Sequence, residues 1–308
     1  MKGLILLFLI LNNDWQTKLL KEGFKESLYL RYKEISIKEK KYDEFKKFSL
    51  ELLKKYPKEY LILMALGEIE IINKNLKAGY NYLEEALGIS KESNFSISQL
   101  LEKYKIEIED KNYPFLSFLS LIKRNNFKKG WEFLNFLPEG EIKIYYQILL
   151  SGYLGFIDSA LIYIFNFLIR FEKSPLKEEV QEFGLLLSSG KDMKDYFNSL
   201  ILLTIGEREK VIDILKKINE DYSLIKLAEI YQKENKIQSA IIALEDALKT
   251  KNDYFRSKAQ YYLASLLLEK NENRAIFLLE DIVFNHPLTP YTFYSQELLN
   301  KLKIKGIR

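Results

Sequence analysis

The sequence contains no cysteine, and its only histidine is His286. Without cysteine the chain forms no disulfide, no thiolate zinc site, no iron–sulfur cluster and no cysteine nucleophile. A single histidine leaves almost nothing for Ser-His-Asp catalysis or for a metal site built from several imidazoles. These two absences exclude several of the commonest kinds of enzyme chemistry.

Glycine and proline are also scarce, with 13 and 6 residues in a chain of 308. So few turn-forming residues disfavour a β-sandwich or barrel, whose short strands need frequent turns. The chain is 47% hydrophobic and 29% charged, which is an ordinary balance for a folded protein, so wholesale disorder is excluded. Its length suits either two compact domains or one elongated repeat array.

Neither sign of charge dominates, since 47 Lys and Arg residues stand against 43 Asp and Glu residues, for a net charge of +4. Acids and bases alternate in short runs, as in residues 38–44 (KEKKYDE) and 207–210 (EREK). Nucleic-acid-binding modules instead concentrate basic residues along one stripe. We therefore expect solvated helix faces and no nucleic-acid partner.

The amino terminus carries eight consecutive apolar residues, 4–11, behind Lys2. This arrangement is typical of a secretory signal, and the run is too short to span a bilayer, which takes about 20 residues. No small-residue pair suited to a signal peptidase follows it, and the alternative is a first helix that docks on the fold. We favour export. Residues 1–20 are thus expected to be a signal peptide or first helix of a periplasmic or cell-envelope protein, with a cytoplasmic protein as the alternative.

A second apolar stretch runs from Tyr145 to Ile169, where Asp158 is the only charged residue. Its length alone would allow a transmembrane helix. Polar residues and glycines interrupt it, however, and the segment that begins at Gly155 has the composition of a turn. We expect two shorter helices packed against each other, and no transmembrane span.

Apolar residues recur at helical spacing along the chain, most clearly in residues 221–254. The first helix expected there carries one apolar face at Leu224, Leu227, Ala228 and Tyr231. After a polar turn at residues 233–236, the second helix carries another at Ala240, Leu244, Ala247 and Leu248. The spacings i, i+3, i+4 and i+7 place each set on one side of a helix. A lone pair of such helices cannot bury both of its faces, so further pairs must pack against it.

The same hairpin pattern returns in residues 58–91 and 255–287. Small residues stand where the two helices must approach each other, at Gly67 and Gly79, at Ala228 and Ala240, and at Ala264 and Ala275. In these features the chain resembles the tetratricopeptide repeat (TPR) family, whose unit is about 34 residues. The match is best over residues 221–287 and 58–91, although Glu70 stands where the family usually has an aromatic residue. The resemblance implies an all-α fold, a right-handed α-solenoid in which helical hairpins stack into a superhelix.

The middle of the chain departs from the repeat. In two places the residues that mark successive helix crossings are more than one unit apart, between 79 and 130 and between 160 and 211. Each of these intervals has room for an extra helix. We predict these helices at residues 98–109 and 176–187. The expected domain is one array over residues 21–308 with degenerate central units, ended by a polar capping helix from Pro290 to about Lys303.

No motif for catalysis or nucleotide binding is present. Residues 184–191 (GLLLSSGK) depart from a phosphate loop in glycine spacing, and Asp192 replaces the hydroxyl that would hold magnesium; a helix end capped by Gly190 explains them better. Carboxylate pairs such as Glu68 and Glu70 are expected on exposed helix faces. We therefore expect no catalytic, cofactor-binding or metal-binding residues and no cofactor, with an enzyme on a helical-solenoid frame as the alternative of another class.

In the implied fold, the first helix of each unit lines a concave groove. The side chains predicted to face it are Met64, Glu68, Ile71, Tyr222, Ile225, Glu229, Gln232, Lys258, Tyr261 and Ser265. Such a mixture of aromatic, aliphatic and singly charged side chains suits an extended peptide or a partner helix. The alternative is that the amino-terminal helix covers part of this surface.

Some relatives in the family hold a partner's terminal carboxylate with Lys and Asn side chains in the groove. The corresponding residues here are Met64, Glu68, Ile225, Glu229, Tyr261 and Ser265, so this mode is not expected. Similar bacterial envelope proteins use such arrays as scaffolds. We expect a non-catalytic protein–protein interaction scaffold in cell-envelope assembly or secretion, with a cytoplasmic regulatory TPR array as the alternative.

Overall fold

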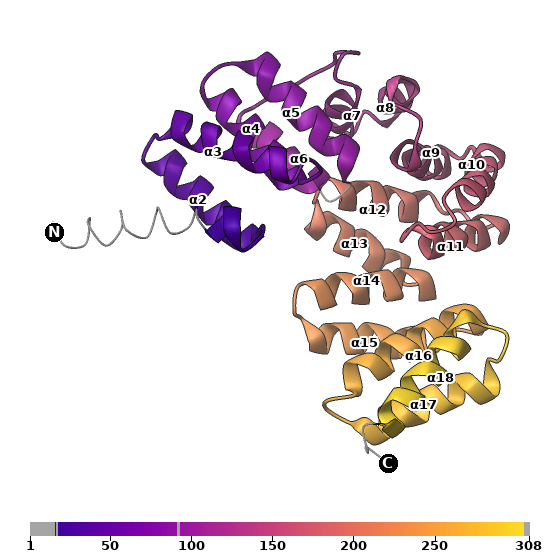
Figure 1. The fold of residues 1–308 in the computed structure, drawn as a ribbon. Helices are drawn as coiled ribbons and strands as arrows, with labels where there is room; N and C mark the ends of the chain where they lie inside the picture. The colour runs from indigo at the N-terminus through magenta and orange to yellow at the C-terminus, as the bar shows by residue number, and fades with distance from the viewer. Residues whose placement is uncertain (1–15, 17, 91–92, 305–308) are drawn as a thin grey trace. The chain divides into compact units, whose positions relative to one another are not determined.

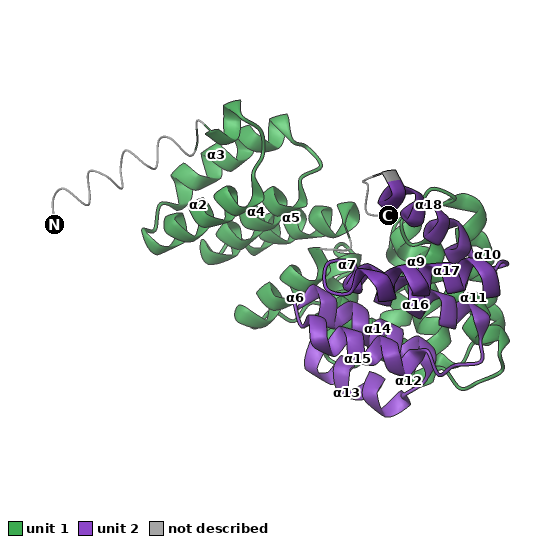
Figure 2. Cartoon of the chain, turned by 90° about the horizontal axis from the view of Figure 1, so that it is seen from below, with its two compact units in different colours: residues 1–207 green, residues 208–308 purple. Residues whose placement is uncertain are grey.

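The computed structural model describes residue 16 and residues 18–90 and 93–304, in which every regular element is a helix (Figure 1). No strand occurs in this part of the chain, so the predicted all-α class is confirmed. The contacts between residues divide the chain into two compact units, residues 1–207 and 208–308 (Figure 2).

The labelled helices of the first unit are α2 (Glu26–Lys38), α3 (Tyr42–Lys55), α4 (Tyr60–Ile72), α5 (Leu76–Ile89), α6 (Ser93–Lys103), α7 (Pro114–Lys123), α8 (Phe127–Phe133), the short 3₁₀ helix η1 (Leu134–Phe136), α9 (Glu141–Leu154), α10 (Ile157–Arg170), α11 (Lys177–Ser188) and α12 (Lys194–Thr204). Those of the second unit are α13 (Arg208–Ile218), α14 (Asp221–Lys233), α15 (Ile237–Ala247), α16 (Asp253–Leu267), α17 (Glu272–Asn285) and α18 (Pro290–Ile304). The polar capping helix predicted from Pro290 corresponds to α18.

Helices that follow one another in the sequence pack as hairpins, and the most extensive contacts join α4 with α5 and α14 with α15. The predicted polar turns between them are present. Each contains a residue in the left-handed region, with φ of 62° at Lys74 and 58° at Asn235. This conformation reverses the chain in very few residues, so the two helices lie directly against each other.

The crossing of α4 and α5 depends on the absence of side chains at Gly67 and Gly79. A Cβ atom on Gly79 would lie 2.9 Å from Cγ1 of Ile71 and 3.1 Å from the carbonyl oxygen of Gly67. A Cβ atom on Gly67 would lie 2.6 Å from Cδ2 of Leu83. The two backbones are therefore in direct contact, as the small residues of the sequence predict.

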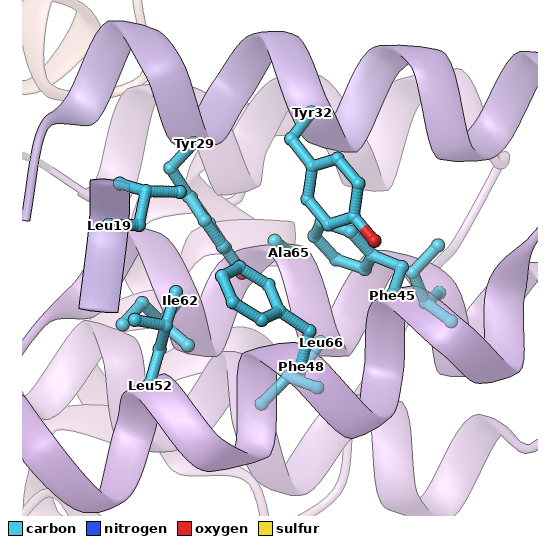
Figure 3. Packing of buried hydrophobic residues seen from close by; sticks show 10 residues of the cluster. Leu19, Tyr29, Tyr32, Phe45, Phe48, Leu52, Ile62, Ala65 and Leu66 are labelled. Atoms are coloured by element: carbon cyan, nitrogen blue, oxygen red, sulfur yellow. The ribbon is translucent and has the colours of Figure 1, made fainter. Parts of the chain in front are cut away.

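The first unit begins with a buried aromatic cluster where α2, α3 and α4 meet (Figure 3). The ring of Phe45 lies 5.6 Å from that of Tyr29 and 5.4 Å from that of Tyr32. The Tyr29 hydroxyl is fully buried and donates a 2.9 Å hydrogen bond to Oγ of Ser49. Burial raises the pKa of Tyr29, so this hydroxyl stays protonated and keeps its hydrogen bond.

Most of the predicted signal peptide or first helix, residues 1–20, lies outside the described residues. What is described of it, Gln16 and residues 18–20, is helical. Leu19 is fully buried in the cluster of Figure 3 and packs with the residues of α2, α3 and α4. The core of the first unit therefore begins before α2.

The apolar stretch from Tyr145 to Ile169 forms the two helices α9 and α10, as predicted, and Gly155 ends α9 with φ of 78°. Among the described helices, none combines the length and the apolar character that crossing a bilayer requires. The expected extra helix over residues 176–187 is α11, which is followed by Gly190 with φ of 72°.

The other extra helix lies about one and a half turns earlier than predicted, as α6 instead of residues 98–109. It ends because Lys105 adopts a left-handed conformation with φ of 52°. The chain beyond is then held by two serine hydroxyls of α7. Oγ of Ser120 accepts a hydrogen bond from the N–H of Ile108 (3.2 Å), and Oγ of Ser117 accepts one from the N–H of Asp110 (2.8 Å).

Two alanine substitutions in α5 test the close crossing. Gly79→Ala is expected to lower the free energy of unfolding by about 1 kcal/mol, because the new methyl group overpacks the contact with α4. Gly88→Ala is the matched control: its Cβ would lie 3.7 Å from the nearest atom, a Phe115 ring carbon, and replacing a helical glycine should stabilise by roughly 0.5–1 kcal/mol. Urea denaturation measures both. Stabilisation by Gly79→Ala would contradict the tight crossing.

Candidate functional site

The predicted groove side chains of α4 are covered by other helices of the first unit. Met64, Glu68 and Ile71 are each at most 6% exposed. One oxygen of the Glu68 carboxylate accepts a hydrogen bond from Nζ of Lys33 in α2 (2.9 Å), and the other accepts one from Nζ of Lys103 in α6 (2.8 Å). The prediction of an exposed groove surface at these three residues is therefore wrong, because α2 and α6 lie against this face of α4.

The paired carboxylates of α4 are buried instead of exposed, which corrects the expectation for Glu68 and Glu70. Glu70 is 3% exposed and lies 2.5 Å from Nζ of Lys46 in α3, and it also accepts a 3.0 Å hydrogen bond from Nδ2 of Asn75. Burial by itself raises the pKa of Glu68, but attraction by Lys33 and the hydrogen bonds from the two lysines outweigh it, and the pKa lies below its ordinary value. Both carboxylates are structural ties between helices.

In the second unit the predicted groove residues lie on α14 and α16. Tyr222, Ile225 and Lys258 are at most 7% exposed, Glu229 and Tyr261 are half-buried, and Gln232 and Ser265 are exposed. The structure brings two of them together, since Nζ of Lys258 lies 3.7 Å from Oε1 of Glu229.

Tyr261 on α16 is covered in part by α18. The ring of Tyr261 lies 5.8 Å from that of Tyr291 and 5.9 Å from that of Tyr294, both on α18. The ring of Tyr222 lies 6.2 Å from that of Phe255. Much of the surface predicted for a partner is thus used for packing within the chain.

A hollow surface lies elsewhere in the first unit, where the end of α5 meets the beginnings of α7 and α9. Two hollows of about 550 and 450 Å³ share Gly88, Ile89, Phe115 and Pro138, so they form one depression, the α5–α9 groove. Its other lining residues are Asn81, Glu84, Glu85, Asn112 and Tyr113 at one end, and Ser90, Glu139, Gly140, Glu141, Ile142, Lys143, Tyr145, Tyr146, Pro175 and Leu176 at the other.

Glu84 holds the two helices that form the middle of the groove in register. Its carboxylate, on α5, accepts hydrogen bonds from the backbone N–H groups of Phe115 (2.7 Å) and Leu116 (2.9 Å) in the first turn of α7. A carboxylate at this position is also favoured by the helix dipole. Burial raises the pKa of Glu84 to about 7, although these hydrogen bonds act in the opposite direction.

The far end of the groove is formed by the beginning of α9. Lys143 is 8% exposed, and its Nζ donates a 2.6 Å hydrogen bond to Glu139. The Tyr145 hydroxyl donates to Glu179 of α11 at 3.0 Å. The residue that precedes α9 is Gly140, which has no side chain to cap the first N–H groups of the helix.

Sequence reasoning missed a set of exposed apolar side chains on the outer faces of second helices. Ile162 on α10, Ile242 on α15 and Phe277 on α17 are 59%, 53% and 66% exposed. Each stands two residues after the small crossing residue of its helix, so they are equivalent positions of the repeat. Counting from the crossing residue would have found them, because the opposite side of each helix is committed to its hairpin partner.

No protein-family model and no curated protein matches this chain. Among solved structures, a chain of the Naa15/Naa10 complex bound to HypK-THB is 15% identical over 88% of this chain, with a TM-score of 0.29, and this chain spans 38% of its length. The TPR domain of P58(IPK) is 12% identical, covering 96% of this chain and 93% of that one (TM-score 0.27). A tetratricopeptide repeat protein from Parabacteroides merdae is 10% identical, covering 83% and 91% (TM-score 0.26). Two of these structures, the P58(IPK) domain and the Parabacteroides merdae protein, carry the name of the family that the sequence resembles.

The buried carboxylate on α4 gives a test of the covered groove face. Glu68→Gln is expected to lower the free energy of unfolding at pH 7 by about 1–3 kcal/mol, because two lysines lose their charged partner. Since the folded-state pKa of Glu68 is lowered, its contribution is present above the unfolded-state pKa and is lost as the pH falls through the folded-state value.

The difference between Glu68→Gln and the wild type should therefore shrink below about pH 4. Urea denaturation at pH 7 and at pH 3.5 measures it. The exposed Glu85 on α5 supplies the control, and Glu85→Gln should change the stability by less than about 0.5 kcal/mol. A Glu68→Gln effect equal to that of the control would show that α2 and α6 are not tied to α4 through this carboxylate.

Proposed function

We propose that this chain is a non-catalytic protein-interaction scaffold that binds an extended segment of a partner protein in the α5–α9 groove. The observation that carries this proposal is the groove itself, a depression of two joined hollows with an apolar middle and polar ends. Its volumes are about 550 and 450 Å³, and both hollows are shallow and open to solvent, which suits an extended segment better than a small enclosed ligand. Protein–protein interaction is also the typical role of helical-repeat arrays.

The groove has the groups that an extended peptide needs. In the shared middle, the exposed Pro138 and the half-buried Ile89 offer apolar contact to a side chain of the partner, and Phe115, which is 6% exposed, lies beneath them. At one end Asn81 carries a side-chain amide, whereas Nδ2 of Asn112 already donates a 2.9 Å hydrogen bond to Asp110. At the other end the uncapped first turn of α9 offers backbone N–H groups. A peptide chain in extended conformation exposes the carbonyl and N–H groups that such partners bind.

The charge of the groove favours a basic peptide. Its ionisable lining groups, apart from tyrosine, are four glutamates and Lys143; the glutamates are Glu84, Glu85, Glu139 and Glu141. Lys143 is already paired with Glu139. Glu84, whose pKa is raised to about 7, is only partly charged at neutral pH. The acidic character of the groove therefore comes mainly from Glu85 and Glu141, although the whole chain has a net charge of +4. Charge complementarity of this kind selects partners and raises association rates.

Binding is proposed over catalysis because Glu84, the groove carboxylate whose pKa is raised to about 7, already accepts hydrogen bonds from two backbone N–H groups of α7. The lining residues of the groove include no histidine, and His286 lies in the other unit, buried, with Nδ1 3.2 Å from an oxygen of Asp253. In the part of the chain that the structure describes, no three His, Asp or Glu side chains are grouped so as to hold a metal ion.

The location that we propose is the periplasm or cell envelope, where such a scaffold would serve assembly or secretion. The support for it is the apolar run of residues 4–11, which lies outside the described residues. The chain purified from its native host is expected to lack this run. Mass spectrometry of its amino terminus measures this, and a protein that retains Met1 or Lys2 would favour the cytoplasmic regulatory array.

Gly88 offers a direct test of the groove, because it is exposed and lines the point where the two hollows join. Gly88→Trp should fill this point and weaken peptide binding at least tenfold while the fold is kept. The probes are two fluorescein-labelled decapeptides, one of alternating Lys and Leu and one of alternating Glu and Leu, measured by fluorescence anisotropy. The acidic groove should bind the Lys peptide more tightly.

The control is Gln238→Trp, which places the same side chain on an exposed position of α15. It should leave binding of the Lys peptide unchanged. Non-specific attraction to a chain with net charge +4 would instead favour the Glu peptide. Preference for the Glu peptide, or equal loss of binding in both tryptophan variants, would contradict a peptide site in the α5–α9 groove.

A further inference from the structure

Helix α10 has two apolar faces, and only one of them is covered in this chain. Ala160, Ile164 and Phe167 are at most 5% exposed and pack within the first unit. On the opposite side lies an exposed stripe of Ile162, Phe165 and Ile169, whose exposed fractions are 59%, 65% and 62%. Monomeric proteins rarely leave so many large apolar side chains together in water.

The exposed stripe has the spacing of a helix–helix seam. Asp158, Ile162, Phe165 and Ile169 are separated by four, three and four residues, which is the a/d pattern by which two helices pack along their length. Two apolar neighbours extend the stripe at its edges: Phe156 before α10 is 49% exposed, and Leu185 on the adjacent α11 is 51% exposed.

The charged residues of α10 complete this pattern. Asp158 in the first turn and Arg170 at the last position are its only charged side chains. Neither forms an ion pair among the residues that the structure describes, and the Arg170 guanidinium lies over the ring of Phe171 at 5.6 Å. The hydrogen bond from Lys143 is the main cause that lowers the pKa of Glu139, and the positive charge of Arg170 also contributes. The helix thus presents an apolar stripe with an acid at one end and a base at the other.

We propose that α10 packs against the α10 of a second copy of this chain, with the two helices antiparallel about a two-fold axis. The two-fold axis passes midway between Ile162 and Phe165, so these two residues are equally distant from it. Ile162 of each copy therefore lies opposite Phe165 of the other. Ile169 then lies opposite Asp158 of the second copy, and Arg170, one residue further on, reaches that carboxylate. Each ion pair occurs twice, as an isologous contact requires.

The antiparallel orientation follows from the charges. A parallel pair would place Asp158 beside Asp158 of the second copy and Arg170 beside Arg170, which is repulsive at both ends. The antiparallel pair replaces both repulsions by attractions, and it also sets the positive end of one helix dipole beside the negative end of the other. A second copy therefore fits this surface better than a partner of unrelated charge.

This inference goes beyond the proposed function and is independent of the α5–α9 groove, which lies on other helices. It would give a dimer two such grooves, and two linked grooves bind a repetitive or oligomeric partner with higher avidity.

The mass of the chain in solution, measured by sedimentation velocity over a range of concentrations, tests the proposal. The wild type is expected to reach the mass of a dimer, and Phe165→Glu to raise the dissociation constant at least tenfold. Phe284→Glu, at a position on α17 that is 78% exposed, is the matched control and should leave the dimer intact. A monomeric wild type at 100 μM, roughly the upper limit for a specific dimer of this size, would overturn the proposal. So would a dimer that Phe165→Glu leaves unchanged.

A charge exchange tests the orientation without changing the apolar stripe. Asp158→Arg and Arg170→Asp should each weaken the dimer severalfold, since each creates two repulsive contacts. The double variant carries both exchanged charges and should restore the dimer. Failure of the double variant to recover would rule out the antiparallel pairing of these two residues.

The absence of cysteine permits a second check of the orientation. Oxidation of a mixture of Asp158→Cys and Ile169→Cys should produce the mixed disulfide. Neither variant alone should cross-link, because identical positions would lie about 16 Å apart along the axis. Cross-linking of each variant with itself is the result expected of parallel helices and would overturn the proposal.

Discussion

The structure depends on a steric constraint, the close contact of two helices at a crossing where neither carries a large side chain. Gly67 and Gly79 let the backbones of α4 and α5 touch, and the alanines at 228 and 240 and at 264 and 275 stand at the corresponding positions of the later hairpins. Once a hairpin has closed in this way, each helix still has an apolar face that needs a cover. The rest of the fold supplies these covers.

The helices that cover these apolar faces do not all belong to the next repeat. Helix α6, which has no place in a regular unit, lies against α4 and brings Lys103 to the buried carboxylate of Glu68. Helix α18 brings Tyr291 and Tyr294 to Tyr261 of α16. Because most of these faces are used for internal packing, the surfaces that we propose for partners are helix ends, as in the α5–α9 groove, and the outer faces of second helices, as in α10.

Glu70 shows how a departure from a family pattern can be compensated locally. It stands where an aromatic residue is usual, on a face that is fully buried, and a carboxylate there would be very unfavourable without partners. Lys46 from α3 and Asn75 from the turn after α4 supply them. Glu70 thus links α3, α4 and the turn that follows α4.

The sequence by itself determined the all-α class, the hairpins and their turns, and the two helices of the stretch from Tyr145 to Ile169, because these features depend on periodicity and composition over a few neighbouring residues. Only the tertiary structure decided that Met64, Glu68 and Ile71 are covered, that Gly88, Phe115 and Pro138 meet in one groove, and that Ile162, Phe165 and Ile169 stay exposed. A helix pattern shows which face is apolar, but not which distant helix covers it. That choice depends on contacts between residues far apart in the chain, which no local pattern records.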